Sequence, residues 1–216
     1  MAIAFDAATQ GGFTSGTTHT FSHTCTGTDR ILFVHSFHND STDRQTGVTY
    51  NGVAMTLVNK ATPASTRYTY LWYLINPATG ANNVVITAGS STAIGGNAVS
   101  YTGADQTTQP DASSITTDSL ATKVSSITTV ADNCWSVLAH IGNGTNPTAS
   151  TNSTLRAGNA TYSDGDLFDN NGVITPAGSY SMTLTAGAVP SSRLMASIKP
   201  AGGGGAPAFI PKVMFF

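Results

Sequence analysis

The stretch Val48-Thr-Tyr-Asn-Gly-Val-Ala-Met-Thr-Leu-Val58 indicates the fold class of this chain most directly. Its two arms are rich in residues that favour strands, and they flank Asn51-Gly52. This dipeptide readily adopts the two positive φ angles of a type I′ turn. The stretch therefore predicts a tight β-hairpin.

Other strand-like segments surround the hairpin at the short spacing typical of a β-sandwich. The segment 2–7 alternates and is followed by a predicted turn at Gly11-Gly12. No segment predicts a helix, and we expect loops and short strands over 143–178. The other predicted strands are 18–24, 31–37, 68–74, 83–87, 93–101, 124–129, 135–141, 180–185 and 194–199. We therefore expect an all-β fold, a single two-sheet antiparallel sandwich of jelly-roll character.

The composition supports an all-β protein and excludes several classes of partner. Only 9% of the 216 residues are charged, and all 11 acidic residues are Asp. A polar surface of Thr, Ser, Asn and Gly suits sheets and turns rather than helices. The net charge of −2 provides no basic surface for nucleic acid. No apolar run approaches the ~20 residues of a membrane helix, and the start of the chain shows no signal-peptide pattern.

The end of the chain differs in character from the rest. Residues 1–199 are expected to form the sandwich, and 200–207 form a linker with a run of glycines between prolines. Residues 208–216 hold large apolar side chains that gain free energy when they are buried. The candidate docking residues of this tail are Phe209, Ile210, Val213, Met214, Phe215 and Phe216. We expect the tail to anchor the domain on a neighbour, with docking on its own sandwich as the alternative.

Two groups of residues are candidate metal ligands. His19, His23, His35 and His38 lie in neighbouring predicted strands, but alternation places His35 and His38 on opposite faces. We therefore interpret these side chains as hydrogen-bonded residues inside the sandwich or as exposed residues at its rim. Asp164, Asp166 and Asp169 lie in a Gly-containing segment that resembles a calcium loop only weakly, because no Glu is present for the bidentate position. We expect no bound cofactor.

The aromatic segment 68–74 has two interpretations. Alternation places Tyr68, Tyr70, Trp72 and Leu74 on one face. Such a face can stack on sugar rings, with Tyr70 and Trp72 as the glycan-binding residues. Because the row ends in Leu, we favour a core position.

The sequence contains no motif that indicates catalysis. The absence of Glu excludes a Glu-dependent hydrolase, and no Gly-x-Ser-x-Gly elbow is present. The two cysteines, Cys25 and Cys134, are too few for a zinc site. They are either disulfide-bonded or buried free thiols.

Several strings resemble a loosely defined set of β-sandwich proteins from bacteriophages and environmental bacteria. They are Arg30-Ile-Leu-Phe-Val34, Gly47-Val-Thr-Tyr-Asn-Gly-Val-Ala-Met-Thr56, Leu71-Trp-Tyr-Leu74, Pro77-Ala-Thr-Gly-Ala-Asn-Asn-Val-Val-Ile86, Ala98-Val-Ser-Tyr-Thr-Gly103, Asp132-Asn-Cys-Trp135 and Ala196-Ser-Ile-Lys-Pro200. The resemblance covers residues 1 to about 200 and carries over no functional residue. It implies a virion component, such as a capsid decoration or tail-associated subunit that is assembled in the host cytoplasm.

These observations lead to one expectation about function. We expect a non-enzymatic structural subunit of a phage-like virion that contacts copies of itself, a capsid protein or a tail protein. It would contact neither nucleic acid nor a membrane. The alternative is a carbohydrate- or receptor-binding module.

Overall fold

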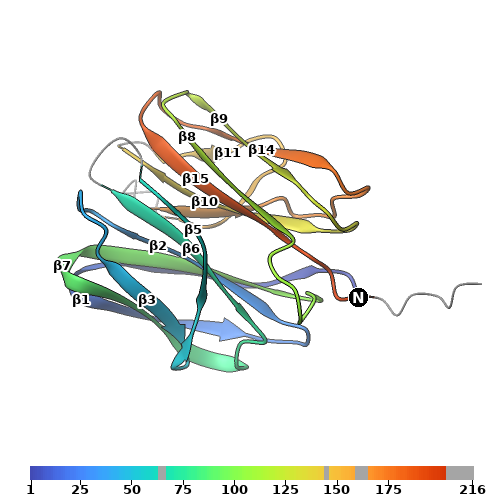
Figure 1. The fold of residues 1–216 in the computed structure, drawn as a ribbon, viewed down its shortest axis with the longest axis horizontal. Coiled ribbons are helices and arrows are strands. Elements are labelled where there is room, and N and C mark those ends of the chain that lie inside the picture. The colour runs from blue at the N-terminus through green and yellow to red at the C-terminus, as the bar shows by residue number, and fades with distance from the viewer. Residues whose placement is uncertain (63–66, 144–145, 159–164, 203–216) are drawn as a thin grey trace, which may run out of the picture.

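The computed structural model describes residues 1–62, 67–143, 146–158 and 165–202, and their regular structure is entirely β (Figure 1). The strands are β1 Ala4–Cys25, β2 Ile31–His38, β3 Gln45–Tyr50, β4 Val53–Ala54, β5 Thr56–Ala61, β6 Tyr68–Ile75, β7 Gly80–Thr102, β8 Ala112–Asp118, β9 Thr122–Thr128, β10 Trp135–Gly142, β11 Thr148–Ala149, β12 Thr154–Ala157, β13 Asp166–Asp169, β14 Ser179–Thr185 and β15 Ser191–Ile198.

The strands form three antiparallel sheets. The large sheet has seven strands, β1 to β7, in the order β4-β3-β7-β2-β6-β5 with β1 also paired to β7. The central sheet has five strands, in the order β12-β13-β10-β15-β8. The small sheet has three, in the order β11-β14-β9. The large sheet forms the lower half of the view in Figure 1, and the other two form the upper half.

The large sheet bends over on itself around two long strands. β1 pairs with β7 along both halves, while β3 and β2 pair with successive parts of the opposite edge of β7. The first arm of β1, residues 4–16, and its second arm, residues 18–25, approach each other through side chains. Thr9 Oγ1 lies 2.9 Å from His23 Nδ1, and His19 Nε2 lies 3.1 Å from the carbonyl oxygen of Gly11. The large sheet is therefore nearly closed.

The length of these two strands corrects two predictions. The predicted turn at Gly11-Gly12 is wrong, because Gly12 (φ 72°) lies at a register shift between Gln10 and Phe13 within β1. A β-bulge of this kind bends a strand without reversing it. The predicted strands 83–87 and 93–101 are likewise parts of the single strand β7.

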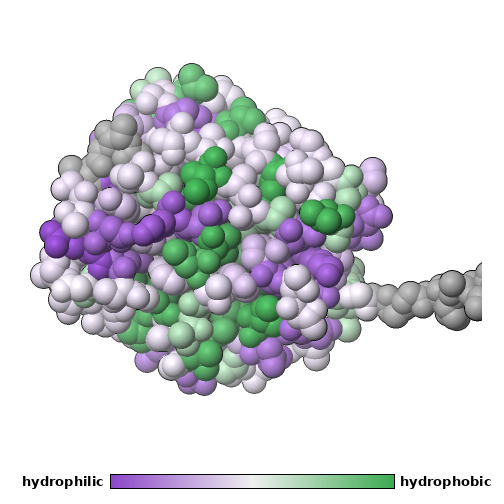
Figure 2. Space-filling model, viewed as in Figure 1, coloured by the Kyte–Doolittle hydropathy of each residue, from purple (hydrophilic) through white to green (hydrophobic). Residues whose placement is uncertain are grey.

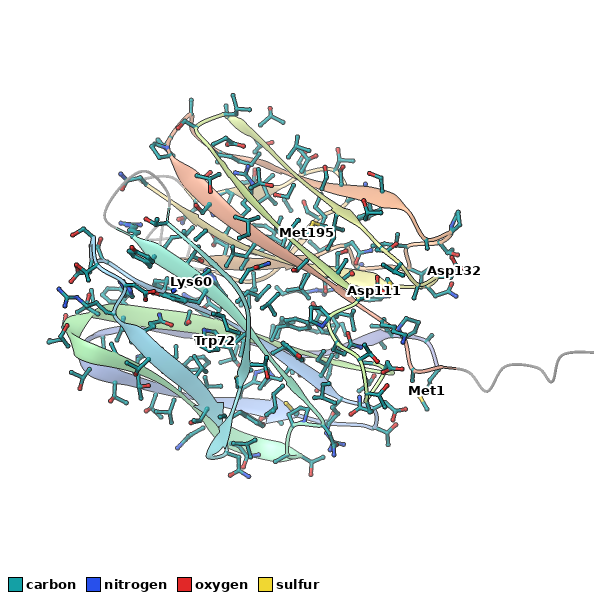
Figure 3. All side chains as sticks on the ribbon, in the orientation of Figure 1. Met1, Lys60, Trp72, Asp111, Asp132 and Met195 are labelled. Atoms are coloured by element: carbon teal, nitrogen blue, oxygen red, sulfur yellow. The ribbon has the colours of Figure 1, made fainter. Side chains whose placement is uncertain are left out.

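Three apolar clusters hold the strands together in layers. The first lies inside the folded large sheet and includes Trp72, the second joins the large and central sheets and includes Trp135, and the third joins the central and small sheets and includes Met195. Figure 3 shows Trp72 in the lower part of the view and Met195 in the upper part. Strands β2, β10 and β15 are buried at every residue, because their alternate side chains enter two different clusters.

The prediction of an all-β antiparallel fold is confirmed, whereas a two-sheet jelly roll is not, because the strands form three sheets. The predicted hairpin is confirmed, with φ of 49° at Asn51 and 76° at Gly52. Strand β8 was not predicted. Cys25 and Cys134 are both buried and free, so the disulfide alternative is wrong.

The first residues of the chain and the end of its described part lie together. The amino group of Met1 donates a 3.0 Å hydrogen bond to the Ala201 carbonyl, and Pro200 forms an isolated bridge with Ala104. This end of the body lies on the right in Figure 1, at the marked N-terminus. We call this side of the molecule the exit end.

Candidate functional site

The six candidate docking residues of 209–216 lie outside the described residues. Their role as an anchor therefore stays a prediction. What the structure adds is the position of Ala201, near the end of the described residues, beside Met1 at the exit end. In Figure 3, Met1 is labelled at the right edge of the body.

Both candidate sugar-stacking residues are buried inside the large sheet. Tyr70 is 2% exposed and Trp72 is 8% exposed, and both belong to its apolar cluster. The Trp72 indole N–H donates a 2.9 Å hydrogen bond to Ser36 Oγ, and the Tyr70 hydroxyl donates one to Asp43. This placement agrees with the interpretation of the segment as core. Neither ring offers a free face to a sugar.

The two candidate calcium ligands that the structure describes do not converge. Asp164 lies outside the described residues, while Asp166 and Asp169 are the first and last residues of β13, a strand rather than a loop. Their side chains have different partners. Asp166 Oδ2 lies 3.3 Å from His140 Nδ1, whereas Asp169 accepts a 2.9 Å hydrogen bond from the Tyr101 hydroxyl and pairs with Arg156 at 2.7 Å. Both carboxylates are therefore used to join strands.

The four histidines singled out from the sequence occupy separate hydrogen-bond networks. His35 Nε2 lies 2.8 Å from Thr69 Oγ1, and His38 Nε2 lies 3.0 Å from the Tyr70 hydroxyl. Burial lowers the pKa of His35 to about 3, so its imidazole is neutral at pH 7. Within the ranges that the structure describes, no group of three His, Cys or Asp residues could hold a metal ion.

His23, Ser100 and Asp6 are residues of the types found in a serine-hydrolase triad, but their hydrogen bonds connect them in a different order. His23 Nε2 lies 3.1 Å from Ser100 Oγ, and that hydroxyl donates a 2.7 Å hydrogen bond to Asp6. In a serine hydrolase the carboxylate orients the histidine, whereas here Thr9 contacts the other ring nitrogen. Burial lowers the pKa of His23 to about 4, against the opposing charge of Asp6. Ser100 is fully buried, so this network ties the arms of β1 to β7.

Sequence reasoning missed a buried charged cluster between the central and small sheets. Arg193 and Lys123 have fully buried side chains, and Arg193 binds Asp118 while Lys123 Nζ lies 3.6 Å from the same carboxylate. Burial and then the charges of these two cations lower the pKa of His140 to about 3. The alternation of Lys123, Ser125 and Ile127 in β9 was the available signal, because one face of this strand is buried throughout.

An apolar cavity lies where the bend of the large sheet meets the central sheet. Its volume is about 190 Å³, and it is lined by Phe13, Phe37, His38, Asn39, Arg67, Ala93 and Ile141. Phe13 is 48% exposed, whereas Ile141 is buried. His38, in the lining, is the last residue of β2. The first residue of that strand, Ile31, pairs with Tyr101, which lies near the exit end. The cavity is therefore at the opposite end of the molecule, which we call the far end.

Uncharged polar residues dominate the outer strands. Thr18, Thr20, Ser22 and Thr24 are the exposed residues along the second arm of β1, and β9 exposes Thr122, Val124, Ser126 and Thr128. On the face shown in Figure 2, hydrophobic side chains gather in several small separate patches among pale ones, and a hydrophilic band crosses the left of the view. Surfaces with so few charges repel one another only weakly.

Comparisons with protein-family models, curated proteins and solved structures find no match to this chain. Among the described residues, none belongs to a helix that is long and apolar enough to cross a membrane.

Proposed function

We propose that this protein is a non-enzymatic structural subunit of a phage-like particle, such as a capsid decoration or tail-associated protein. It would dock through its apolar 208–216 segment and through the uncharged surface of its sheets. Its partners would be copies of itself, a capsid protein or a tail protein. The virion assignment depends on the strand and turn motifs described above.

One observation carries the docking part of this proposal. The described chain ends at Gly202, next to Ala201, which is held beside Met1 at one end of the molecule. Residues 208–216 contain six large apolar side chains. A segment that starts at an end of a rigid body can reach a neighbour. Burial of each large apolar side chain contributes roughly 1.5–3 kcal/mol.

The position of the polar groups also supports a structural role. The buried networks of His23, Asp169 and Arg193 each connect strands that are distant in sequence. The glycan-binding alternative depended on Tyr70 and Trp72, whose burial removes its basis.

The test is the mass of the full chain in solution, measured by light scattering, for the wild type and for a variant with Phe215→Ser and Phe216→Ser. We expect the wild type to form oligomers or to adhere to particles, and the variant to be a folded monomer. As a control, Lys212→Ser changes the same segment without removing an apolar group and should behave like the wild type. If the double variant assembles like the wild type, docking through this segment is refuted.

A further inference from the structure

We propose that the free edge of strand β9 is a contact between two copies of this chain, in which β9 of one copy pairs antiparallel with β9 of the other. This inference deepens the proposed function, on which it rests for the class of partner and for a second contact through residues 208–216. It names the part of the uncharged surface that meets a neighbour.

β9 is an outer strand of the small sheet. It pairs with β14 on one side, and none of the strands in the described ranges pairs with its other side. Figure 1 shows β9 at the top of the view, on the side of the body away from the large sheet. A groove lined by Ser113, Ser114, Ser126 and Thr128 separates the end of β9 from the start of β8. The free edge of β9 is therefore open to a partner strand.

The hydrogen bonds beside β9 show which of its backbone groups face this edge. Ala186 N–H donates to the Ala121 carbonyl, and Thr129 N–H donates to the Gly178 carbonyl, each at 2.9 Å. Both pairs continue the register of β9 with β14, and in an antiparallel ladder the bonded residues alternate with non-bonded ones. The odd-numbered residues of β9 therefore bond to β14. The residues whose N–H and C=O groups face the free edge are Thr122, Val124, Ser126 and Thr128.

These outward groups are almost unused within the part of the chain that the structure describes. The one hydrogen bond to them there is a long one, 3.5 Å from the Arg193 guanidinium to the Val124 carbonyl. A carbonyl oxygen has two lone pairs, so this contact leaves the Val124 carbonyl able to accept a bond from a partner strand.

The other sheet edges have features that oppose pairing, such as charged side chains, β-bulges and short length. β4 and β11 are two residues long, while β5 and β12 each contain a register shift and a charged residue, Lys60 and Arg156. β1 contains three register shifts, and its Asp6 accepts a hydrogen bond from Thr26 across its two arms. β8 packs against β5 and ends at Asp118.

β9 has none of these protective features. It runs for seven residues without a register shift, a proline or an exposed charge. Its charged residue, Lys123, is fully buried. Two copies can therefore bring this edge together without repulsion between like charges.

The edge is also complementary to itself. When two β9 strands pair with Ser125 at a two-fold axis, Thr122 lies opposite Thr128 of the second copy. Val124 then lies opposite Ser126 of the second copy. In this register the outward groups meet each other, so each copy donates four hydrogen bonds and accepts four, which makes eight.

The chain's own 208–216 segment is a poor partner for this edge. Pro211 has no backbone N–H and divides the segment, so the segment cannot supply an unbroken ladder of hydrogen bonds. β9 of a second copy supplies seven consecutive strand residues.

The strand pair is too small to hold two copies together by itself. Seven strand residues extend over about 24 Å, and a strip of that length and one strand in width is well below the ~1,200 Å² that a stable interface buries. We therefore expect β9 pairing to act together with the docking of residues 208–216, because two linked contacts strengthen each other.

The test changes the charge of β9 in the full chain. Val124→Lys with Ser126→Lys places like charges directly opposite each other in the proposed pair, and so does Val124→Glu with Ser126→Glu. The matched control is Ala81→Lys with Asn83→Lys, which adds the same charge at exposed positions of β7 in the large sheet. Thermal unfolding checks that each variant is folded, and light scattering gives its mass.

We expect the wild type and the control to assemble, and each β9 variant alone to have the mass of one chain. A 1:1 mixture of the lysine and glutamate variants places opposite charges across the strand pair and should regain the mass of the wild type. If both β9 variants are folded but their mixture stays monomeric, β9 does not face its own copy and the inference is overturned.

The remaining results separate this inference from the proposed function. If the β9 variants assemble like the wild type while Phe215→Ser with Phe216→Ser does not, the inference is overturned and the proposed function stands. If the Phe variant assembles while the β9 variants are monomeric and regain the wild-type mass on mixing, β9 pairing is supported and docking through 208–216 is refuted. A wild type that is monomeric at every concentration overturns the inference, and particle adhesion then tests the proposed function separately.

Discussion

Asp118 is the residue whose single replacement we expect to cost the most stability. It lies between Arg193 and Lys123, whose side chains are fully buried. Asp118→Asn keeps the shape of the side chain but leaves the buried cations of Arg193 and Lys123 without a countercharge. Breaking a buried ion pair in this way costs about 3–5 kcal/mol. We expect this loss in the free energy of unfolding, measured by urea denaturation.

A matched control is Asp40→Asn, which removes the same charge from a more exposed pair with Arg44. Exposed ion pairs contribute little to stability, so the urea midpoint should move much less. Equal shifts for the two variants would show that the charges around Asp118 are not effectively buried.

The histidines give a second prediction at this scale, the dependence of stability on pH. Burial lowers the pKa of all five, to about 4 for His23 and to about 3 for His35 and His140. The unfolded chain therefore binds more protons than the folded chain as pH falls below about 6.5. The contribution of the neutral histidines to the free energy of unfolding is fully present above that pH. It is lost as the pH falls toward their pKa values in the folded protein.

The measurement is the urea midpoint at several values between pH 7.5 and pH 4.5, where each neutral histidine contributes a slope of up to about 1.4 kcal/mol per pH unit. His140→Gln removes one titrating group and should make the slope shallower. A midpoint that does not change over this range would mean that the imidazoles take up protons in the folded protein.

At the level of elements, the prediction concerns the close approach of strands at the bend of β7. A Cβ on Gly96 would lie 2.5 Å from Ile86 Cδ1 and 2.9 Å from the His35 carbonyl oxygen. Gly96→Ala must therefore push strands apart, and overpacking of this kind costs about 1–3 kcal/mol. Gly89→Ala is the control in the same strand, because its Cβ would meet only Thr46 Cγ2 at 3.7 Å. If both variants have the same thermal midpoint, the close approach does not constrain the sheet.

The strands around this bend show which parts of the secondary structure could be predicted from the sequence. The strand at 31–37 and the Asn51-Gly52 hairpin depend on local preferences, and both are confirmed. β1 and β7 were divided at glycines, because glycine in a sequence marks turns and bulges alike. β8 was missed because its strand is mostly Ser and Thr and is only partly buried. Which glycine allows two strands to meet depends on a tertiary contact.

The candidate site was predictable to a smaller degree than the fold. The apolar tail is visible in the sequence because it follows a Gly-rich linker. The cavity is not, because its lining joins Phe13, Ala93 and Ile141 from three strands. Likewise, alternation showed that Tyr70 and Trp72 share a face. That this face turns inward follows from the folding-over of the large sheet, which the local pattern does not encode.

At the scale of the whole molecule, the layers predict that the described body unfolds as one unit. The apolar cluster between the large and central sheets draws residues from both, and the buried Tyr101–Asp169 hydrogen bond crosses the same junction. Unfolding either sheet alone would expose this cluster and break the hydrogen bond from the Tyr101 hydroxyl to the Asp169 carboxylate. An intermediate with only one of these sheets folded would lose much of the apolar packing that stabilises that sheet.

The two tryptophans allow this cooperativity to be measured, because Trp72 lies inside the large sheet and Trp135 lies at the junction. In Trp72→Phe only Trp135 reports by fluorescence, and in Trp135→Phe only Trp72 reports. For each variant we expect the fluorescence curve in urea to coincide with the curve from far-ultraviolet circular dichroism, as a two-state transition requires. If the Trp135 signal changes at a lower urea concentration than the circular dichroism, the junction opens first. The large sheet would then be a separate folding unit, and residues 1–199 would not form a single domain.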